Sequence, residues 1–446
     1  MMFQPECETM PRSQLAALQL RRLQELLRRL ENSPSPFWRE RLASAKVRAE
    51  EFRHLEQLAS LPFTVKADLR DNYPLGMLNV PMRQVVRLHA SSGTRGRPTI
   101  VAYTAQDIDI FAEVNARSLA AAGATPDDVI HNAYGYGLFT GGLGLHYGIE
   151  RLGATAVPVS GGNTPLQLQL LVDLEANGLC CTPSYAMLLA ERAAEAGILD
   201  RLRLRYAVLG AEPWSEEMRR KIEEAFGGID ACDIYGLSEV MGPGVAIECR
   251  EEKRGLHVWE DHFYPEIVDP QTGEPLPEGQ QGELVLTTLT KEAFPVLRYR
   301  TGDITYLTNE PCSCGRTMRR IGRIAGRVDD MLIIRGVNVF PSEIEAVIMG
   351  DPALAGHYAI VVDRRGALPR LEVRAELAQP LEAEQAQAVA RRLREALDSR
   401  LRLSTDVVME APGAIPRTEV GKARRVYERT PSSDPFPGPG LAAERS

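Results

Sequence analysis

The sequence predicts an α/β protein with a large first domain and a smaller α+β unit at its end. Between residues 127 and 209, short apolar stretches alternate with segments of helical periodicity, the pattern of a sheet with helices on its faces. The last quarter departs from this alternation. Because 446 residues are more than one hydrophobic core usually serves, we expect at least two domains.

Composition narrows the functional classes. The net charge is −8 at pH 7 and no long basic run occurs, so the chain lacks the charge pattern of a nucleic-acid-binding protein. No apolar stretch is long enough to cross a bilayer. The first residues contain no apolar signal core, and we therefore expect a cytoplasmic protein.

The first 80 residues predict helices. Leucines recur at helical spacing over 13–31, with arginine and glutamate between them, which predicts an amphipathic helix. Its arginine-rich face is compatible with a membrane surface, although a solvated face on a helix that packs on a core is the commoner use of such a pattern. A shorter helix is expected to begin after 61–64 and to end near 73.

A glycine- and hydroxyl-rich loop over 90–99 separates two predicted strands, 85–88 and 99–103. Its glycines permit a sharp turn that presents backbone N–H groups, and its hydroxyl and arginine side chains suit a polyphosphate. The Walker A spacing is absent, and a hairpin turn explains the loop alone equally well. The residues that we expect at the phosphates are Ser91, Ser92, Gly93, Thr94, Gly96 and Arg97.

The alternating region begins after this loop with a predicted helix over 104–122. Polar and glycine-bearing loops follow two of the later predicted strands, at 210–213 and 235–239, and binding sites in open sheets gather at such strand ends. Strands are expected at 127–131, 152–158, 179–182, 206–209, 265–269 and 282–288, and helices at 164–176 and 185–196.

Aromatic residues separated by glycines occupy 132–142, with the sequence NAYGYGLFTGG. Such a stretch offers flat apolar walls with open space beside them, which suits a planar ligand. A tight aromatic-glycine turn within the core is the structural alternative.

The last quarter predicts a small α+β unit. Strands are expected at 331–334, 358–363, 371–376 and near Val407, and helices at 341–349 and 381–401. We therefore divide the chain into a first domain over 1–328, a second domain over 329–430, and a tail over 431–446 that is rich in proline, glycine and serine and is expected to be disordered.

Four side chains suit a nucleotide reaction. The Glu239 carboxylate can hold Mg²⁺, which prefers oxygen ligands, and Tyr235 can stack on a base. Asp303 can accept hydrogen bonds from ribose hydroxyls, and Lys422 can donate to a developing negative charge. Each also has an ordinary structural explanation: a core tyrosine, an acid at a helix start, a turn aspartate and a surface lysine.

Cysteine and histidine spacing indicates a metal site. Three thiols and one imidazole, from Cys249, His257, Cys312 and Cys314, make the Cys₃His set of a structural Zn²⁺ site. His262 is the alternative imidazole ligand. A turn with free thiols explains the Cys-x-Cys pair without a metal.

Taken together, the motifs SSGTRGRPT, YGYGLFTGG, GAEPWS, DIYGLSE, RYRTGD, GRVDDMLIIRGVNVFP and PRTEVGK resemble the phenylacetate–CoA ligase group of adenylate-forming enzymes. The resemblance covers roughly residues 15 to 428, with the motifs in the expected order. It implies a large adenylate-forming domain of layered α/β sheets and a small mobile C-terminal domain. It also implies a two-step reaction, in which a carboxylate attacks the α-phosphorus of ATP and the thiol of coenzyme A then displaces AMP.

The resemblance assigns roles residue by residue. The 91–99 loop would close over the β- and γ-phosphates, Glu239 would hold Mg²⁺, and Lys422 would bridge carboxylate and phosphate before the small domain rotates about a hinge at Asp329. Members of the group carry zinc at the place of the Cys₃His set. The ATP- and AMP-binding positions would further include Gly210, Ala211, Glu212, Pro213, Asp233, Ile234, Tyr235, Gly236, Asp303 and Arg327.

The acid is expected to be a flat aryl carboxylate: phenylacetate, benzoate or a substituted benzoate such as anthranilate. The sequence departs from the family at Arg97, where lysine is usual, and at Arg95, where threonine is common. At position 97 arginine keeps the charge but changes its geometry. Two alternative functions are transfer of the acid to an acyl-carrier protein and a catalytically inactive nucleotide-binding scaffold. A homodimer is plausible by family analogy. The expected acid pocket comprises Tyr134, Tyr136, Phe139, Gly142, Ala211, Pro213 and Tyr235.

Overall fold

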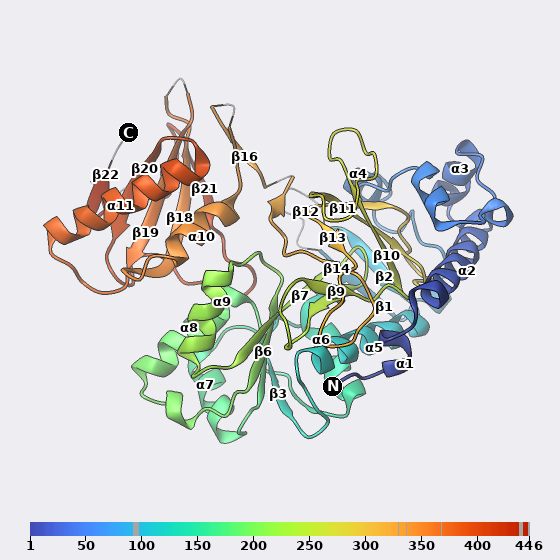
Figure 1. The fold of residues 1–446 in the computed structure, drawn as a ribbon, viewed down its shortest axis with the longest axis horizontal. Helices are drawn as coiled ribbons and strands as arrows, with labels where there is room; N and C mark the ends of the chain where they lie inside the picture. The colour runs from blue at the N-terminus through green and yellow to red at the C-terminus, as the bar shows by residue number, and fades with distance from the viewer. Residues whose placement is uncertain (92–97, 329, 336, 367, 437–439, 445–446) are drawn as a thin grey trace. The chain divides into compact units, whose positions relative to one another are not determined.

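The structure is a computed structural model that describes residues 1–91, 98–328, 330–335, 337–366, 368–436 and 440–444. The chain forms two compact units (Figure 1). The first comprises 1–182, 193–211 and 228–324, and the second comprises 183–192, 212–227 and 325–446. Two short segments from the middle of the chain thus belong to the same unit as the last quarter, which continuous domain limits do not anticipate.

A nine-stranded mixed sheet is the frame of the first unit, with the order β13-β14-β9-β8-β7-β6-β5-β3-β4. The strands from β4 to β7 pair in parallel, and the strands from β7 to β13 pair antiparallel. The nine strands are β3 (Val129–Asn132), β4 (Thr155–Val157), β5 (Gly178–Cys181), β6 (Tyr206–Gly210), β7 (Asp230–Leu237), β8 (Gly242–Glu248), β9 (Leu256–Val258), β13 (Leu307–Thr308) and β14 (Arg320–Ile321).

Helix α6 (Thr140–Leu152) was not predicted from the sequence, which we interpreted as a loop to 142 and a strand from 152. Glycines are poor helix formers, but here they allow close packing on α5 (Ala105–Ala121). A Cβ at Gly144 would lie 2.4 Å from Phe111 Cζ, and one at Gly148 would lie 2.4 Å from Asn115 Cβ. The observed β4 is accordingly shorter than predicted.

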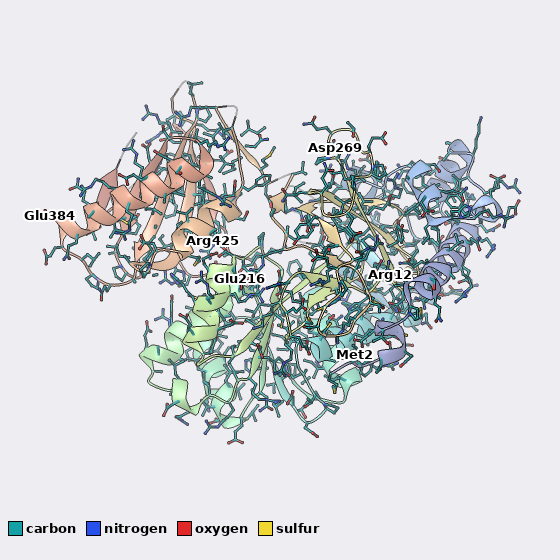
Figure 2. All side chains as sticks on the ribbon, viewed as in Figure 1. Met2, Arg12, Glu216, Asp269, Glu384 and Arg425 are labelled. Carbon is teal, nitrogen blue, oxygen red and sulfur yellow. The ribbon has the colours of Figure 1, made fainter. Side chains whose placement is uncertain are left out.

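The predicted N-terminal amphipathic helix is confirmed as α2 (Arg12–Glu31), whose leucines are buried. Its arginines do not all face solvent. Arg12, labelled in Figure 2, pairs with the buried Glu260, and Arg22 lies 3.6 Å from Asp261. Further short elements here are α1 (Pro5–Glu8), α3 (Pro36–Ser44), α4 (Lys66–Asp71), η1 (Ala49–Glu51), η2 (Leu55–Ser60) and η3 (Met82–Gln84).

Two further β structures belong to the first unit. The hairpin of β1 (Arg87–Ala90) and β2 (Ile100–Tyr103) confirms the two strands that flank the glycine-rich loop. Strands β10 (Phe263–Val268), β11 (Gly282–Thr288) and β12 (Tyr299–Thr305) pair antiparallel. The remaining elements of this unit are α7 (Thr164–Asp173) and η4 (Leu199–Arg201).

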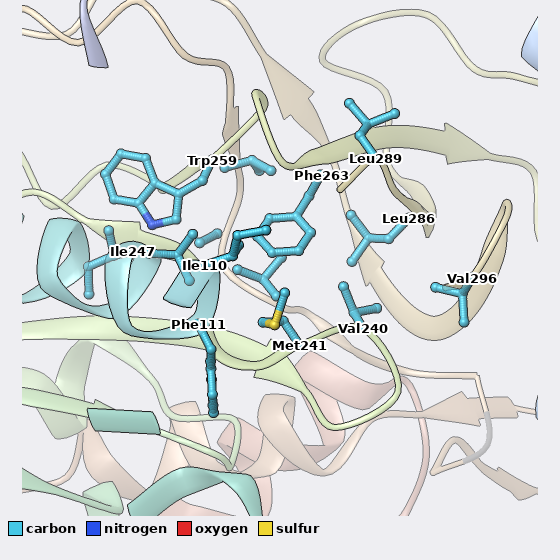
Figure 3. Packing of buried hydrophobic residues seen from close by; sticks show 14 of the residues in the cluster. Ile110, Phe111, Val240, Met241, Ile247, Trp259, Phe263, Leu286, Leu289 and Val296 are labelled. Carbon is cyan, nitrogen blue, oxygen red and sulfur yellow. The ribbon is translucent and has the colours of Figure 1, made fainter. Parts of the chain in front are cut away.

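The main apolar core lies within this first unit and joins its sheets and helices. Figure 3 shows Phe111 of α5 near Met241 and Val240, which lie in the β7–β8 turn, with Phe263 of β10 beside them. All four of these side chains have an exposed fraction of 0%. The backbone of this turn is therefore anchored in the core.

The second unit contains a five-stranded sheet with the order β21-β18-β19-β20-β22. The strands and helices predicted for this part of the chain are present. Among all described residues, no helix is long and apolar enough to span a membrane. Its elements are α8 (Pro183–Glu195, of which 183–192 belong here), α9 (Glu216–Ala225), α10 (Pro341–Met349), α11 (Ala383–Leu401), β15 (Gly326–Arg327), β16 (Leu332–Ile334), β17 (Val337–Val339), β18 (Leu354–Asp363), β19 (Arg370–Leu377), β20 (Thr405–Glu410), β21 (Val426–Arg429) and β22 (Ala442–Glu444).

The tail over 431–446 was expected to be disordered, but its described residues make ordered contacts. The Arg429 side chain donates to Asp434 at 2.7 Å, and Arg374 donates to the Phe436 carbonyl at 3.1 Å. Strand β22 then pairs antiparallel with β20. Composition alone misses this arrangement because the arginines that bind the tail lie elsewhere in the sequence.

Candidate active site

Close backbone packing defines the carboxyl ends of β6 and β7. A Cβ at Gly210 would lie 2.1 Å from the Ile234 carbonyl oxygen, and one at Gly236 would lie 1.7 Å from the Gly242 carbonyl oxygen. Only glycine fits at either position. Ala211 follows with a φ of 72°, a left-handed conformation that is uncommon for alanine and concentrates at functional sites.

Tyr235 and Asp303 come together although 68 residues separate them. The Tyr235 hydroxyl donates to the Asp303 carboxylate at 2.6 Å, and Asp303 is 5% exposed. Tyr235 lies inside strand β7 and not in the loop in which we expected it, and Asp303 lies inside strand β12 and not in the turn of its structural alternative. Their neighbour Asp233 is held by its backbone N–H, which donates to Glu248 at 2.8 Å.

Glu239 lies in the turn that joins β7 to β8 and is 7% exposed. Within the described part of the chain, its carboxylate has no hydrogen-bond or ion-pair partner. Its oxygens are not among the fully buried side-chain atoms that lack a hydrogen-bond partner, and its charge acts on the nearby Lys291. A carboxylate that no protein group binds directly is available to bind a cation.

A hydrogen-bond network fixes Tyr136 after β3. Asn132 donates to the Tyr136 hydroxyl at 2.9 Å, and His146 of α6 lies 3.3 Å from the same oxygen. Burial raises the pKa of Tyr136 to about 12. Tyr136 is therefore a neutral phenol at physiological pH, held in one orientation by side chains on two elements.

The other aromatic-glycine residues have different surroundings. Tyr134 is 8% exposed and belongs to the main apolar core, whereas Phe139 is half exposed. A Cβ at Gly142 would lie 2.6 Å from the Gly135 carbonyl oxygen, so the chain is tightly folded here. Tyr136 therefore lies in a polar network of the kind that orients a ligand-facing side chain.

Four predicted site residues belong to the second unit: Glu212, Pro213, Arg327 and Lys422. The Glu212 carboxylate accepts hydrogen bonds from the backbone N–H groups of Ser184 at 2.7 Å and Ala423 at 3.0 Å. It therefore binds the residue next to Lys422. Lys422 and Pro213 are exposed, and Arg327 lies 3.5 Å from Asp330.

Part of the predicted phosphate loop lies outside the described residues, as does the predicted hinge. Ser91 is described, and its backbone N–H donates to the Thr99 carbonyl at 2.9 Å, which closes the base of the hairpin. The positions outside the described residues are Ser92, Gly93, Thr94, Arg95, Gly96, Arg97 and Asp329.

The four predicted zinc ligands converge in the first unit. Cys249 Sγ lies 3.4 Å from Cys312 Sγ, and Cys314 Sγ lies 3.4 Å from His257 Nε2. All four ligand atoms lie within 4.8 Å of one another. Ligands about 2.0–2.3 Å from a tetrahedral zinc would be roughly 3.5–3.8 Å apart, so the side chains fit that ion with little movement.

The pKa of Cys314 and the position of His262 both support Cys249, His257, Cys312 and Cys314 as the ligand set. Hydrogen bonds from Cys249 and then His257 lower the pKa of the Cys314 thiol well below its usual value. The alternative ligand His262 lies elsewhere, where its Nδ1 is 2.8 Å from Thr290 Oγ1 and its Nε2 is 3.2 Å from Asp261. His257 is therefore the imidazole of the cluster.

Sequence reasoning missed several residues around the site. Asn132 and His146 were not recognised as partners of Tyr136, and Lys291 was not singled out. A signal for Lys291 existed, because it stands between the apolar strand 282–288 and the apolar residues that follow. The partners of Tyr136 gave no such signal, since the helix that carries His146 was itself not predicted.

Comparison with protein families finds two separate matches. The AMP-binding enzyme family matches residues 41–289, and the AMP-binding enzyme C-terminal domain matches residues 336–430. Together they cover the glycine-rich loop, the β6 and β7 edge and the segment that carries Lys422.

Individual relatives match over almost the whole chain. A phenylacetate-coenzyme A ligase of Thermus thermophilus is 53% identical, with 96% of this chain and 99% of the relative covered. One of Escherichia coli is 52% identical, with 94% and 96% covered. Among solved structures, a 2-hydroxyisobutyryl-CoA ligase in the postadenylation state in complex with 2-HIB-AMP has a TM-score of 0.88 and 30% identity, with 95% of this chain and 92% of that chain covered.

Proposed function

This chain belongs to the AMP-binding enzyme family and is an AMP-forming acid–coenzyme A ligase, and we propose that the acid it activates is phenylacetate. The support is the identity of 52–53% to two phenylacetate-coenzyme A ligases over nearly their full lengths. ATP and coenzyme A are the other substrates. In the first step the carboxylate attacks the α-phosphorus and pyrophosphate leaves. In the second the thiol attacks the acyl carbon and AMP leaves.

The buried Glu239 is the observation that carries the site assignment. Its unpartnered carboxylate supports a role as the ligand of Mg²⁺, which would neutralise the phosphates of ATP. The Ser91–Arg97 loop would close over the β- and γ-phosphates. Tyr235, the backbone at Gly210, Ala211, Asp233, Ile234 and Gly236, and the residues Glu212 and Pro213 would flank the adenine.

Asp303 would bind the ribose hydroxyls, with Arg327 nearby. The Tyr235 hydroxyl holds the Asp303 carboxylate by a 2.6 Å hydrogen bond. An ionised carboxylate has about four acceptor sites, so it can accept hydrogen bonds from several hydroxyl groups at once. The same contact orients the Tyr235 ring, so the adenine and ribose subsites would be coupled.

The aryl pocket would be formed by Tyr134, Tyr136, Phe139, Gly142, Ala211, Pro213 and Tyr235. The network from Asn132 and His146 supports Tyr136 as a fixed wall that contributes an aromatic face. An aromatic wall held in one orientation favours stacking of a flat ring, which supports an aryl acid as the substrate.

Lys422 would donate to the carboxylate and phosphate oxygens during adenylation. The second domain would then rotate about Asp329, which removes the lysine and admits the thiol. The hydrogen bond from Ala423 N–H to Glu212 supports a defined position for the lysine-bearing segment. The domain limits 1–328 and 329–430 remain part of this proposal.

Cys249, His257, Cys312 and Cys314 would hold a structural Zn²⁺. The ion would crosslink β9 to the turn that precedes β14, without a part in the chemistry. Homodimerisation stays a prediction from family analogy, and cytoplasmic location stays a prediction from the lack of an apolar signal core. An acyl-carrier protein stays the alternative acceptor.

Acid-dependent exchange of labelled pyrophosphate into ATP tests the reaction. Phenylacetate should support the fastest exchange in a panel with benzoate, anthranilate and a fatty acid, and coenzyme A should convert the adenylate to a thioester. If exchange occurs and the acyl group is transferred to a carrier protein but not to coenzyme A, the acyl acceptor is the carrier protein. No exchange with any acid would refute the proposal.

A further inference from the structure

Lys291 is a charged group that the reaction outlined above does not use. Of the six lysines in the chain, all of them described, only Lys291 has an exposed fraction of 0%. Transfer of an ammonium group out of water is costly unless the protein replaces its hydration. The contacts that do so therefore indicate what the residue is for.

Both contacts of Lys291 lead to the turn that carries Glu239. Lys291 Nζ donates to the Val240 carbonyl oxygen at 2.9 Å and lies 4.6 Å from the centroid of the Tyr103 ring. The Tyr103 hydroxyl in turn donates to the Met241 carbonyl oxygen at 2.8 Å. A cation and a phenol that touch each other thus bind two consecutive carbonyl groups, directly after Glu239.

The rest of the turn is held as firmly. The backbone N–H groups of Val240 and Met241 both donate to the Leu237 carbonyl oxygen at 3.1 Å. The two side chains are wholly buried among apolar residues, as Figure 3 shows. The backbone carbonyl and N–H groups of 240 and 241 are all hydrogen-bonded, whereas the adjacent Glu239 carboxylate accepts no hydrogen bond from the described residues.

Lys291 is itself placed by α5. The Asp107 carboxylate accepts from the backbone N–H groups of Glu292 at 2.7 Å and Ala293 at 2.9 Å, and also caps the helix through the Thr104 N–H. Burial lowers the pKa of Lys291 to about 8, and the charges of Asp107 and Glu239 act in the opposite direction. Glu239 is thus one of the two carboxylates that stabilise the charged lysine.

We propose that Lys291 and Tyr103 are positioning residues that fix the β7–β8 turn so that the Glu239 carboxylate is oriented for Mg²⁺ and ATP. This inference rests on the proposed role of Glu239. It predicts that loss of either contact weakens the use of magnesium while leaving the acid site unchanged. A lysine that only filled the core would affect stability alone.

The test is the dependence of phenylacetate-driven pyrophosphate exchange on free Mg²⁺ at saturating ATP. Lys291→Met replaces the lysine by an uncharged side chain of similar length. A hydrogen bond from a charged group contributes about 1.5–3 kcal/mol, so this variant should raise the half-saturating Mg²⁺ concentration about tenfold or more. Tyr103→Phe keeps the ring and loses one neutral hydrogen bond, so a rise of roughly threefold is expected. The KM for phenylacetate should change less than about twofold in both variants.

Lys221→Met is the matched control. Lys221 is mostly buried and its Nζ also donates to a single carbonyl, that of Leu354 at 2.9 Å, but it lies on α9. Lys221→Met should therefore leave the dependence of pyrophosphate exchange on Mg²⁺ unchanged. If Lys291→Met does not fold, Tyr103→Phe gives the same readout.

Glu239→Gln separates the proposed role of Glu239 as a Mg²⁺ ligand from the proposed positioning role of Lys291 and Tyr103. A large magnesium shift in Glu239→Gln with none in Lys291→Met or Tyr103→Phe overturns the positioning role and leaves the assignment of Glu239 intact. No shift in Glu239→Gln refutes the assignment itself, whatever the lysine variant shows. A lower melting temperature of Lys291→Met with unchanged magnesium dependence would make the residue purely structural.

Discussion

The Tyr235 hydroxyl donates a 2.6 Å hydrogen bond to the Asp303 carboxylate and thereby joins β7 of the large sheet to β12 of the smaller one. The two residues lie on strands whose sequences give no sign of contact. Because Asp303 is 5% exposed, the phenol supplies part of what water would otherwise provide to a buried charge. In the proposed site this pair holds the nucleoside part of ATP.

Tyr235→Phe tests this pair. The variant keeps the ring but leaves one oxygen of a buried carboxylate without its donor, which costs about 1.5–3 kcal/mol for a charged hydrogen bond. We expect the KM for ATP to rise about tenfold or more in steady-state kinetics, with the KM for phenylacetate nearly constant. Tyr306→Phe, at a partly exposed tyrosine after β12, is the control. An unchanged KM for ATP would remove Tyr235 and Asp303 from the nucleotide site.

Lys422→Ala should separate the two half-reactions. Removal of one donor to developing negative charge typically costs 10²–10³ in rate, so adenylation, measured by pyrophosphate exchange, should fall at least about a hundredfold. Thioester formation from premade phenylacetyl-adenylate should stay within about threefold, because the lysine has left the site by then. Arg424→Ala, at a neighbouring cation, serves as control. Equal losses in both half-reactions would contradict a rotating domain.

Zinc should be present at close to one equivalent per chain in metal analysis of the purified protein. Cys312→Ser should lose the ion and lower the melting temperature, because the ion links β9 to the turn before β14. Cys7→Ser, at a cysteine outside the cluster, should retain it. Purified protein without zinc, or a Cys312→Ser variant that keeps it, would refute the site.

Gly236→Ala probes the close approach at the edge of β7. The added Cβ would lie 1.7 Å from the Gly242 carbonyl oxygen, so the turn that carries Glu239 must move. We expect a lower melting temperature and loss of most pyrophosphate exchange. Gly350→Ala, whose Cβ would have no neighbour nearer than 3.4 Å, should change the melting temperature little. Full activity of Gly236→Ala would show that the turn tolerates displacement.

Asp261→Asn should show a stability loss that depends on pH. Burial would raise the pKa of Asp261, but the charges of His262, Arg117 and Arg22 outweigh it and hold the pKa at about 2. A lowered pKa stabilises the fold above the unfolded value near 4, and this contribution disappears as the pH falls through about 2. From a difference of about two units we expect a loss of roughly 2 kcal/mol at pH 7 that shrinks towards pH 2.

Urea unfolding at pH 7, 4 and 2.5 measures this effect. Asp109→Asn is the control, at an exposed aspartate on the same helix as Arg117. A stability difference for Asp261→Asn that stays constant between pH 7 and pH 2.5 would contradict the lowered pKa.

Much of the fold could be predicted from local pattern. Leucine periodicity predicted α2, and β-branched runs predicted the β1–β2 hairpin. Helix α6 could not be predicted, because its glycines lower helix propensity. Their contribution is the close packing of α6 on Phe111 and Asn115 of α5, which only the tertiary structure shows. The contacts of the tail with Arg374 and Arg429 escaped for the same reason: the partner that orders the segment is distant in sequence.

The candidate site divides in a similar way. Glu239, Asp303, Tyr235 and the Cys₃His set could be proposed from the sequence because each lies in a motif whose residue types suit the proposed chemistry. Lys291 and His146 were not, since a lysine is usually at the surface and a histidine has many uses. Their roles depend on what lies opposite them, which is Val240 in one case and Tyr136 in the other.

By itself, the sequence determined the α/β class, the order of the motifs and the chemical character of the reaction, because these depend on residue type and on spacing along the chain. Only the tertiary structure decided that Tyr235 binds Asp303, that His257 and not His262 completes the thiol cluster, and that a buried lysine lies beneath the turn of Glu239. The physical reason is that hydrogen bonds and buried charges act over a few ångströms in space, whatever their separation along the chain.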